Sequence, residues 1–223
     1  MDKIKSKEIL FFGKITAGIT HEIKNVLAII QESSGLMEDI LDITPDETFT
    51  HKDKFHTSLK RILSQIDRGV DITTRLNKFA HSPDHSPANV DLNDVSEQMV
   101  LLASRFARLK NVVLNADPHD ASITIKTHPV TLEMAIFESI EIILNALSSD
   151  GTITLVPRIA QDRYVFGIRY EGTVPAEDEV SLSVSSSEGW KSLQNTMAYL
   201  GGTAEAVDSA LEIRLYFPQS INT

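Results

Sequence analysis

Apolar or small residues recur in alternating steps of four and three along the first forty residues of the chain. They are Phe12, Thr16, Ile19, Ile23, Val26, Ile30, Ser33, Met37 and Ile40. A seam sustained over four heptads is typical of a helix that packs in a bundle or coiled coil. It predicts a rod roughly 43 Å long, which ends at the turn signal "DITPDET" around Pro45.

A second apolar stripe follows this turn and predicts a second long helix. Its members are Phe55, Leu59, Ile62, Leu63, Ile66, Val70, Leu76 and Phe79. Two long helices joined by a short turn form a helical hairpin. Because a lone hairpin leaves much of its apolar stripe in water, we expect a second copy of the chain to cover it, in a homodimeric four-helix bundle.

The pattern changes after the hairpin, where "HSPDHSPANVD" indicates a linker. Beyond it we expect a helix over 93–110, strands in "VVLNA" and "SITIK", a helix in "VTLEMAIFESIEIILNALSS", strands in "GTITLVPRIA" and "RYVFGIRYEG", a helix in "GWKSLQNTMAYLGG" and closing strands in "TAEAVDSALEIRLYFP". This order favours a sheet with helices on one face. The predicted fold class is α plus α+β: a hairpin at 1–82, a linker at 83–92 and an α/β sandwich at 93–223.

Composition narrows the classes of partner. The chain has 223 residues and a formal charge of −10, which argues against the basic face of a nucleic-acid binder. It has no cysteine for disulfides or thiolate metal sites. No apolar run reaches the ~20 residues that span a bilayer, and "MDKIKSKEILFF" is too charged for a secretory signal. We therefore expect a cytoplasmic protein that binds neither nucleic acid nor membrane.

His21 is the candidate reactive group of the first helix. It lies two residues from Ile19 and two from Ile23, so it points away from the seam toward solvent. Its face is shared by Ala17, Gly18, Lys24 and Asn25, one turn away on either side, and Ala28 follows one turn further along. Glu22 could hold one ring nitrogen and leave the other as a nucleophile, although an ordinary solvated His–Glu pair fits the same spacing. A metal site is not favoured, because no second histidine follows His21 at i+4.

The stretch "FGKITAGITHEIKNVLAII" resembles the phosphoacceptor box of bacterial sensor histidine kinases, and "DRGVDITTRLNKFAH" resembles the end of the second helix of the same dimerisation and phosphotransfer domain. The resemblance implies that His21 is phosphorylated, that Glu22 assists as acid/base and orienter, and that Asn25 positions water. The face that docks a response regulator would then comprise Ala17, Gly18, Lys24, Ala28 and Glu32. Val26 stands where the family usually has proline, so the helix should lack the corresponding kink.

The second half resembles the family's ATP-binding domain, but its nucleotide boxes are altered. In "ESIEIILNALSSDGTITL" Asn145 holds the place of the asparagine that ligates magnesium, and Glu141 replaces another asparagine. Without the resemblance, these two are a solvated i, i+4 pair. In "IRYEGTVPAED" Tyr170 falls where the family has the aspartate that binds adenine, and only Gly172 of the glycines remains. The ring of Tyr170 would occupy the adenine slot.

The phosphate lid is altered as well. Where the family shows a Gly-x-Gly-Leu-Gly run whose backbone cradles phosphate, this chain has Gly189 followed by Trp190. The serines at 185–187 indicate a polar surface loop. "YLGGTAEAV" nevertheless matches the family's closing helix and strand. We therefore expect a fold of the histidine-kinase ATPase type that does not bind ATP, with Asn145 and Glu141 as vestiges of the site.

The seam begins at Phe12, so we expect no sensing module ahead of it. These features together resemble the histidine phosphotransferases of bacterial phosphorelays, which pass a phosphoryl group between receiver aspartates. Partners would be response-regulator receiver domains, which supply Mg²⁺, so no intrinsic cofactor is expected. Two alternatives stay open: a sensor-less soluble histidine kinase or phosphatase with an altered ATP site around Asn145, and a non-catalytic module that binds regulators.

Overall fold

The computed structural model describes residues 2–43, 51–82, 86–146, 150–160, 163–172, 187–207 and 211–218. The helices and strands predicted from the sequence are present. Their bounds, in chain order, are α1 Asp2–Ile43, α2 Lys52–Ala80, β1 Ala88–Asp91, α3 Leu92–Arg108, β2 Val112–Ala116, β3 Thr124–Thr127, α4 Pro129–Ala146, β4 Gly151–Ala160, β5 Arg163–Gly172, α6 Glu188–Tyr199, β6 Thr203–Val207 and β7 Glu212–Pro218.

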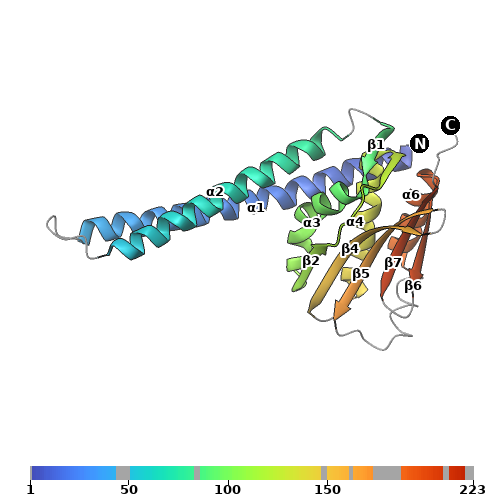
Figure 1. The fold of residues 1–223 in the computed structure, drawn as a ribbon. Coiled ribbons are helices and arrows are strands. Elements are labelled where there is room, and N and C mark those ends of the chain that lie inside the picture. Colours follow the sequence, from blue (N-terminus) through green and yellow to red (C-terminus); the bar gives the residue numbers. More distant parts are fainter. Residues whose placement is uncertain are drawn as a thin grey trace.

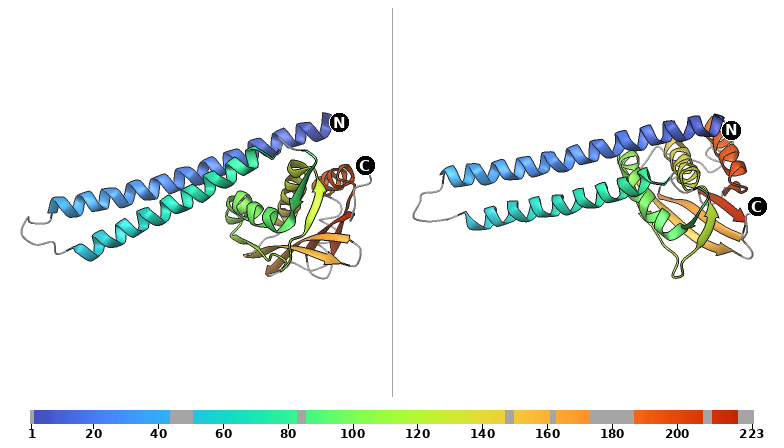
Figure 2. Two further views of the ribbon diagram at one scale, coloured as in Figure 1. Left: turned by 45° about the horizontal axis from the view of Figure 1, so that its top comes forward. Right: turned by 90° about the horizontal axis from the view of Figure 1, so that it is seen from above.

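The first two helices form the predicted hairpin, a rod that projects from the rest of the molecule (Figure 1). They run antiparallel side by side, and the contact buries Val26 of α1 and Ile72 of α2. The first part of α1 extends beyond the end of α2 and lies against the helices of the second domain (Figure 2). The hairpin is therefore anchored at one end only.

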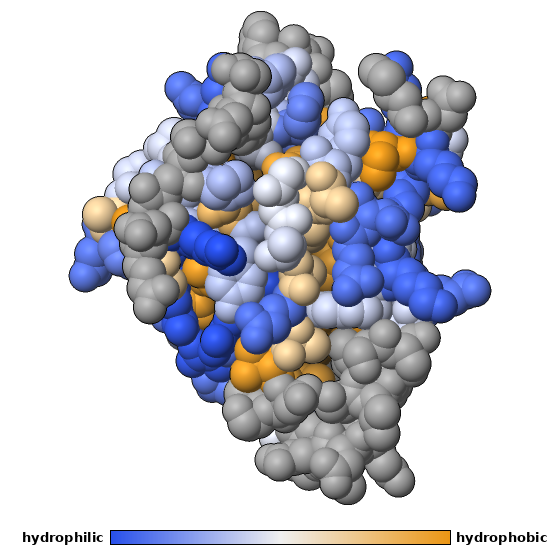
Figure 3. All heavy atoms as spheres, turned by 90° about the vertical axis from the view of Figure 1, so that its right-hand side faces the viewer, coloured by the Kyte–Doolittle hydropathy of each residue, from blue (hydrophilic) through white to orange (hydrophobic). Residues whose placement is uncertain are grey.

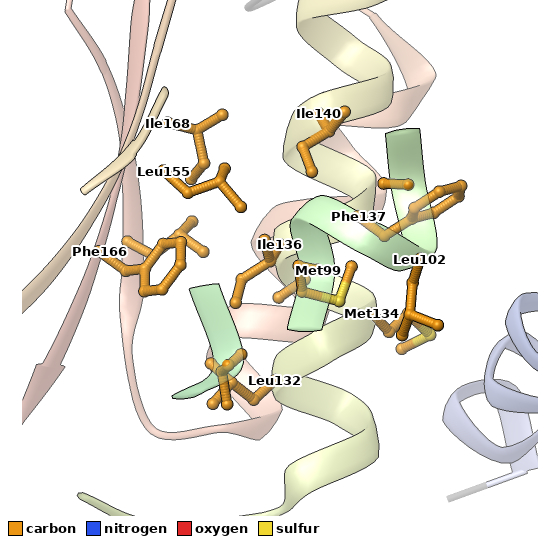
Figure 4. Packing of buried hydrophobic residues seen from close by; sticks show 14 of the residues in the cluster. Met99, Leu102, Leu132, Met134, Ile136, Phe137, Ile140, Leu155, Phe166 and Ile168 are labelled. Atoms are coloured by element: carbon orange, nitrogen blue, oxygen red, sulfur yellow. The ribbon is translucent and has the colours of Figure 1, made fainter. Parts of the chain in front are cut away.

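The second domain is a sheet of five strands covered by helices on one face. The strand order is β2-β4-β5-β7-β6, with β2 parallel to β4 and the other pairs antiparallel. Leu155, Phe166 and Ile168 of the sheet face Ile136 of α4 across the core (Figure 4). This confirms the predicted α/β sandwich.

One part of the predicted linker belongs to the second domain. Residues 88–91 form strand β1, which pairs antiparallel with β3 from Ala88 opposite Thr127 to Asp91 opposite Thr124. The carboxylate of Asp91 then caps α3 by accepting a hydrogen bond of 2.9 Å from the backbone N–H of Asn93. The linker prediction of 83–92 was too long, because the strand obtains its hydrogen bonds from a segment more than thirty positions away.

Hairpin and second domain share one hydrophobic core. Phe11 of α1 packs edge-on against Phe79 of α2, with ring centroids 5.5 Å apart, and lies 5.4 Å from the ring of Phe137 on α4. Phe106 of α3 meets Phe137 at 5.1 Å. Aromatic pairs at these distances stabilise the contact beyond their buried area. The two parts are therefore packed together rather than merely tethered.

An apolar stripe on α2 is left in water. Leu59, Leu63, Ile66 and Val70 are 40–59% exposed and recur in steps of four and three, so they lie on one face of the helix. By contrast, the end of the molecule formed by the second domain shows hydrophobic surface in small patches between hydrophilic side chains (Figure 3). Among the described helices, none combines the length and apolar character needed to cross a membrane.

Candidate functional site

His21 lies about midway along α1 with its imidazole exposed, in the orientation that the heptad pattern predicts. Ile19 and Val26 on the other side of the helix are almost fully buried and hold this orientation. Four of the residues predicted to surround the histidine are also exposed: Ala17, Lys24, Asn25 and Ala28. A side chain placed in this way can be reached by another protein.

Gly18 differs from its predicted role as an open position for a partner. It is buried, and a Cβ atom there would lie 3.1 Å from ring carbons of Phe106 on α3. That distance is tighter than ordinary packing allows, so the glycine makes room for α3 of the same chain. One edge of the surface around His21 is therefore bounded by the second domain.

Glu22 also differs from the prediction that it orients the imidazole. The residue is 5% exposed, and its Oε2 lies 3.0 Å from Arg68 Nη2 on α2 and 2.5 Å from Arg108 Nη2 on α3. Within the described part of the chain, no hydrogen bond joins Glu22 to His21. Charge-assisted contacts of this kind are strong, so Glu22 ties α1 to both neighbouring helices.

Replacing Glu22 by alanine should destabilise the fold by about 1–2 kcal/mol, because it removes two charge-assisted contacts from a buried position. The arginines are about half exposed and can turn to solvent, which limits the loss. Glu32→Ala is the matched control, since the carboxylate of Glu32 is 69% exposed and lies 3.4 Å from Arg61. Urea unfolding should separate the first variant from wild type and leave the control within about 0.5 kcal/mol.

A cleft of about 420 Å³ opens beside Glu22, between α1, α2 and α3. Its charged lining is balanced, with three arginines and three carboxylates: Arg68, Arg75, Arg108, Glu22, Asp71 and Glu97. Arg75 is paired with Asp71 at 3.1 Å, and the other two arginines contact Glu22. The three arginines of the cleft thus form ion pairs with carboxylates of the same chain.

The predicted vestiges of a nucleotide site lie on α4. Glu141 forms an ion pair with Lys14 of α1, and Lys14 also lies over the rings of Phe106 and Phe137 at 5.7 and 5.3 Å. Asn145, one turn further along, is exposed. Through this ion pair, Glu141 is part of the contact between the hairpin and the second domain.

Tyr170 is buried at the end of β5. It is 3% exposed, and its hydroxyl donates a hydrogen bond of 3.0 Å to the carbonyl of Asp150. Gly151 and Gly172 are opposite each other in the β4–β5 pair, and a Cβ atom at either would overlap the tyrosine ring. The two glycines therefore make room for the ring.

Replacing Tyr170 by phenylalanine should cost about 1 kcal/mol, the usual contribution of one hydrogen bond, because the ring stays in place while the carbonyl of Asp150 loses its donor. Tyr199→Phe serves as control, since Tyr199 is 44% exposed. Chemical denaturation at fixed protein concentration measures both. An equal effect of the two substitutions would contradict a specific bond to Asp150.

Of the stretch expected to correspond to the phosphate lid, which begins at Ser185, Ser185 and Ser186 lie outside the described residues. Directly after them, Ser187 caps α6 by accepting a hydrogen bond of 3.0 Å from the backbone N–H of Trp190. Trp190 is buried, and a Cβ atom at Gly189 would lie 3.1 Å from Ile142. Gly189 and Trp190 thus allow the start of α6 to pack against the core.

Sequence reasoning missed the arginines that hold Glu22 and the aromatic ring over Gly18. Arg68, Arg108 and Phe106 come from other helices, and no local pattern announces them. Sequence reasoning also did not single out Glu133, which is buried as well. Its position in the middle of the apolar run "TLEMAIF" was a signal for a buried charge. Among the described residues, no group of three or more histidine, aspartate or glutamate side chains could hold a metal ion.

Comparison of the sequence with known proteins finds sensor histidine kinases among the similar proteins. The chain is 25% identical over 182 residues to the sensor histidine kinase ZraS of Salmonella typhi. The matched region covers 81% of this chain and 37% of that protein. The ZraS of Klebsiella oxytoca is 25% identical over 158 residues, covering 71% of this chain and 32% of the relative.

These matches support a relationship to the two-component histidine kinases. The chain spans about a third of the length of the relatives it matches. No family model matches the chain. Among solved structures, the histidine kinase AdeS of Acinetobacter baumannii has a TM-score of 0.47 at 14% identity, covering 90% of this chain and 98% of that one. The histidine kinase ThkA in complex with the response regulator protein TrrA has a TM-score of 0.48 at 14% identity, covering 99% and 67%.

Proposed function

We propose that the chain is a histidine phosphotransferase of a two-component phosphorelay, in which His21 carries the phosphoryl group. The observation that carries this proposal is the exposed imidazole on a rigid helix, beside four exposed residues that a partner could contact. Phosphoryl transfer depends on in-line positioning and charge stabilisation more than on covalent help from the scaffold. A helix that presents one imidazole suits this requirement.

In the proposed reaction the unprotonated ring nitrogen of His21 attacks the phosphorus of an aspartyl phosphate on a receiver domain. The nitrogen–phosphorus bond forms as the phosphorus–oxygen bond to the aspartate breaks, and the aspartate leaves as a carboxylate. The reverse step returns the group to another receiver. The receiver's own Mg²⁺ would neutralise the charge on the transferred group.

Around His21, the exposed residues Ala17, Lys24, Asn25, Ala28 and Glu32 would form the docking face. Lys24 would attract the acidic pocket of a receiver, and Asn25 would position water for removal of the phosphoryl group. Glu22 can assist the imidazole only by exchanging its arginine partners, so its role as orienter stays a prediction. Gly18 would not belong to this docking face, because Phe106 of the same chain packs against it.

We propose that the second domain does not bind a nucleotide. Tyr170 has no carboxylate to accept from an adenine amino group, and its buried ring fills the space between Gly151 and Gly172. Glu141 is paired with Lys14. ATP would therefore take no part in the reaction, and the second domain would serve as a scaffold and part of the docking surface.

The proposal includes a homodimer in which a second copy covers the apolar stripe of α2. Leu63→Glu, at the centre of that stripe, should weaken dimerisation at least about tenfold, because a charge would have to be buried. Thr57→Glu, on an exposed position of the same helix outside the stripe, is the matched control. Sedimentation velocity over a concentration series measures both. A monomeric wild type would contradict the dimer.

A histidine kinase that phosphorylates His21 from ATP is the second candidate, favoured by the similarity to ZraS over 81% of the chain and by the presence of Asn145. A non-catalytic regulator-binding module is the third, and it predicts that His21→Gln retains all cellular function. Transfer from phosphorylated receiver domains onto wild type but not onto His21→Gln tests the leading proposal. Labelling of His21 by ATP alone would favour the kinase.

A further inference from the structure

A second cavity lies where the hairpin joins the second domain, at the C-terminal end of α2. It has a volume of about 340 Å³ and is bounded by the end of α2, by β1 and by the first turns of α3 and α4. Val90, Val95 and Pro129 supply apolar walls, while Gln98 and Glu133 line its buried part. This size and lining are typical of pockets for small molecules.

Glu133, which lines the buried part of this cavity, has one unsatisfied carboxylate oxygen. The residue is 3% exposed, and its Oε1 accepts hydrogen bonds from Gln98 Nε2 at 2.7 Å and Ser82 Oγ at 3.4 Å. Its Oε2 is buried and has no hydrogen-bond partner among the described residues. Buried polar atoms are rarely left without a partner, because each one costs the loss of its hydration. Once the carboxyl is ionised, this oxygen can accept a hydrogen bond from a ligand that donates.

The charges around the cavity favour a cation. Lys78 of α2 and His81, directly after that helix, line the cavity together with Asp91 of β1 and Asp94 of α3. Lys78 Nζ lies 3.4 Å from Asp94 Oδ2, so the lysine is engaged at the exposed rim. With Glu133 ionised, carboxylates outnumber cationic side chains, and an anion would be repelled.

We propose that this cavity binds a small organic cation of the amidine or guanidine class, with an apolar body against Val90, Val95 and Pro129 and an N–H group donating to Glu133 Oε2. A ligand held in this way touches α2 together with β1, α3 and α4, so it bridges hairpin and second domain. The inference does not depend on the chemistry of His21.

Proton release is the expected signature of binding. Burial raises the pKa of the Glu133 carboxyl to about 8, while the Ser82 hydroxyl and the charge of Lys78 oppose the rise. Near neutral pH the free carboxyl is therefore mostly protonated, and a cation binds best after the proton has left. Affinity should rise about tenfold per pH unit up to about pH 8 and then level off.

Isothermal titration of the full chain with benzamidine, which is cationic over this range, tests the proposal. At pH 7, titrations in buffers of different ionisation enthalpy should report release of about one proton per ligand. Glu133→Gln should weaken binding at least about tenfold, whereas Glu97→Gln, an exposed glutamate on α3, should leave it unchanged. Benzamide, the neutral compound of the same shape, should not bind.

Each contrary result overturns the inference. Absence of benzamidine binding to wild type excludes the cation site, and equal binding of benzamide excludes the need for charge. Binding without proton release, or unchanged binding to a folded Glu133→Gln variant, shows that Glu133 is not the acceptor. Proton release is measured on the wild-type protein, so the test holds even if Glu133→Gln fails to fold.

Discussion

Substituting His21 by glutamine should reduce phosphoryl acceptance from a phosphorylated receiver at least about a thousandfold. Glutamine keeps the helix and the polar surface but has no nucleophilic ring nitrogen, and removing a nucleophile costs orders of magnitude in rate. Stability should stay within about 0.5 kcal/mol of wild type, since the imidazole is exposed and has no partner among the described residues. Receiver binding should persist, because the rest of the docking face is unchanged.

His56→Gln is the matched control for this experiment. His56 is also an exposed histidine on a hairpin helix, so the same chemical change is made away from the proposed site. Label transfer to this variant should equal that of wild type. Transfer onto His21→Gln at the wild-type rate would mean that another residue carries the phosphoryl group.

Stability should fall as the pH rises from about 5 to 8, and Glu133→Gln should abolish the part of this fall that comes from Glu133. The pKa of Glu133 is raised from its ordinary value of 4.5 to about 8 by burial. Below pH 4.5 both folded and unfolded chains hold the proton. Between 4.5 and 8 the unfolded chain releases it while the folded chain keeps it, so rising pH favours unfolding. Above 8 the folded chain also ionises and the slope vanishes.

Each pH unit contributes up to about 1.4 kcal/mol, and less near pH 5 and pH 8, so the advantage of Glu133→Gln over wild type should grow by roughly 3–4 kcal/mol between pH 5 and pH 8. Glutamine keeps the acceptor for Gln98 and Ser82 and cannot ionise. Urea unfolding at a fixed protein concentration, repeated at each pH with Glu97→Gln as control, gives the difference. Parallel stability curves for wild type and Glu133→Gln would show that the carboxyl titrates normally in the folded chain.

The long periodic elements were predictable because their signal is local. The seam from Phe12 to Ile40 and the apolar run of α4 each specify a helix and its buried face without reference to the rest of the chain. The exposure of His21 follows from the same periodicity. Strand β1 could not be predicted, since its four residues are ordered by hydrogen bonds to β3.

The contacts that surround the candidate site are non-local, which is why sequence reasoning misassigned two of its members. Glu22 was expected beside His21, but helices α2 and α3 bring Arg68 and Arg108 to its carboxylate. Gly18 was expected to be open, but α3 places Phe106 over it. Both differences depend on how the second domain packs against α1, which heptad spacing does not encode.

The most direct test of the phosphotransferase proposal offers the wild-type protein two phosphoryl donors in parallel. One is radiolabelled ATP with Mg²⁺, and the other is a panel of receiver domains labelled on their aspartate. The account predicts that at least one receiver labels the wild-type chain, that ATP does not, and that His21→Gln takes label from neither. Stable labelling of His21 by ATP with no receiver present, or no transfer from any receiver, would contradict it.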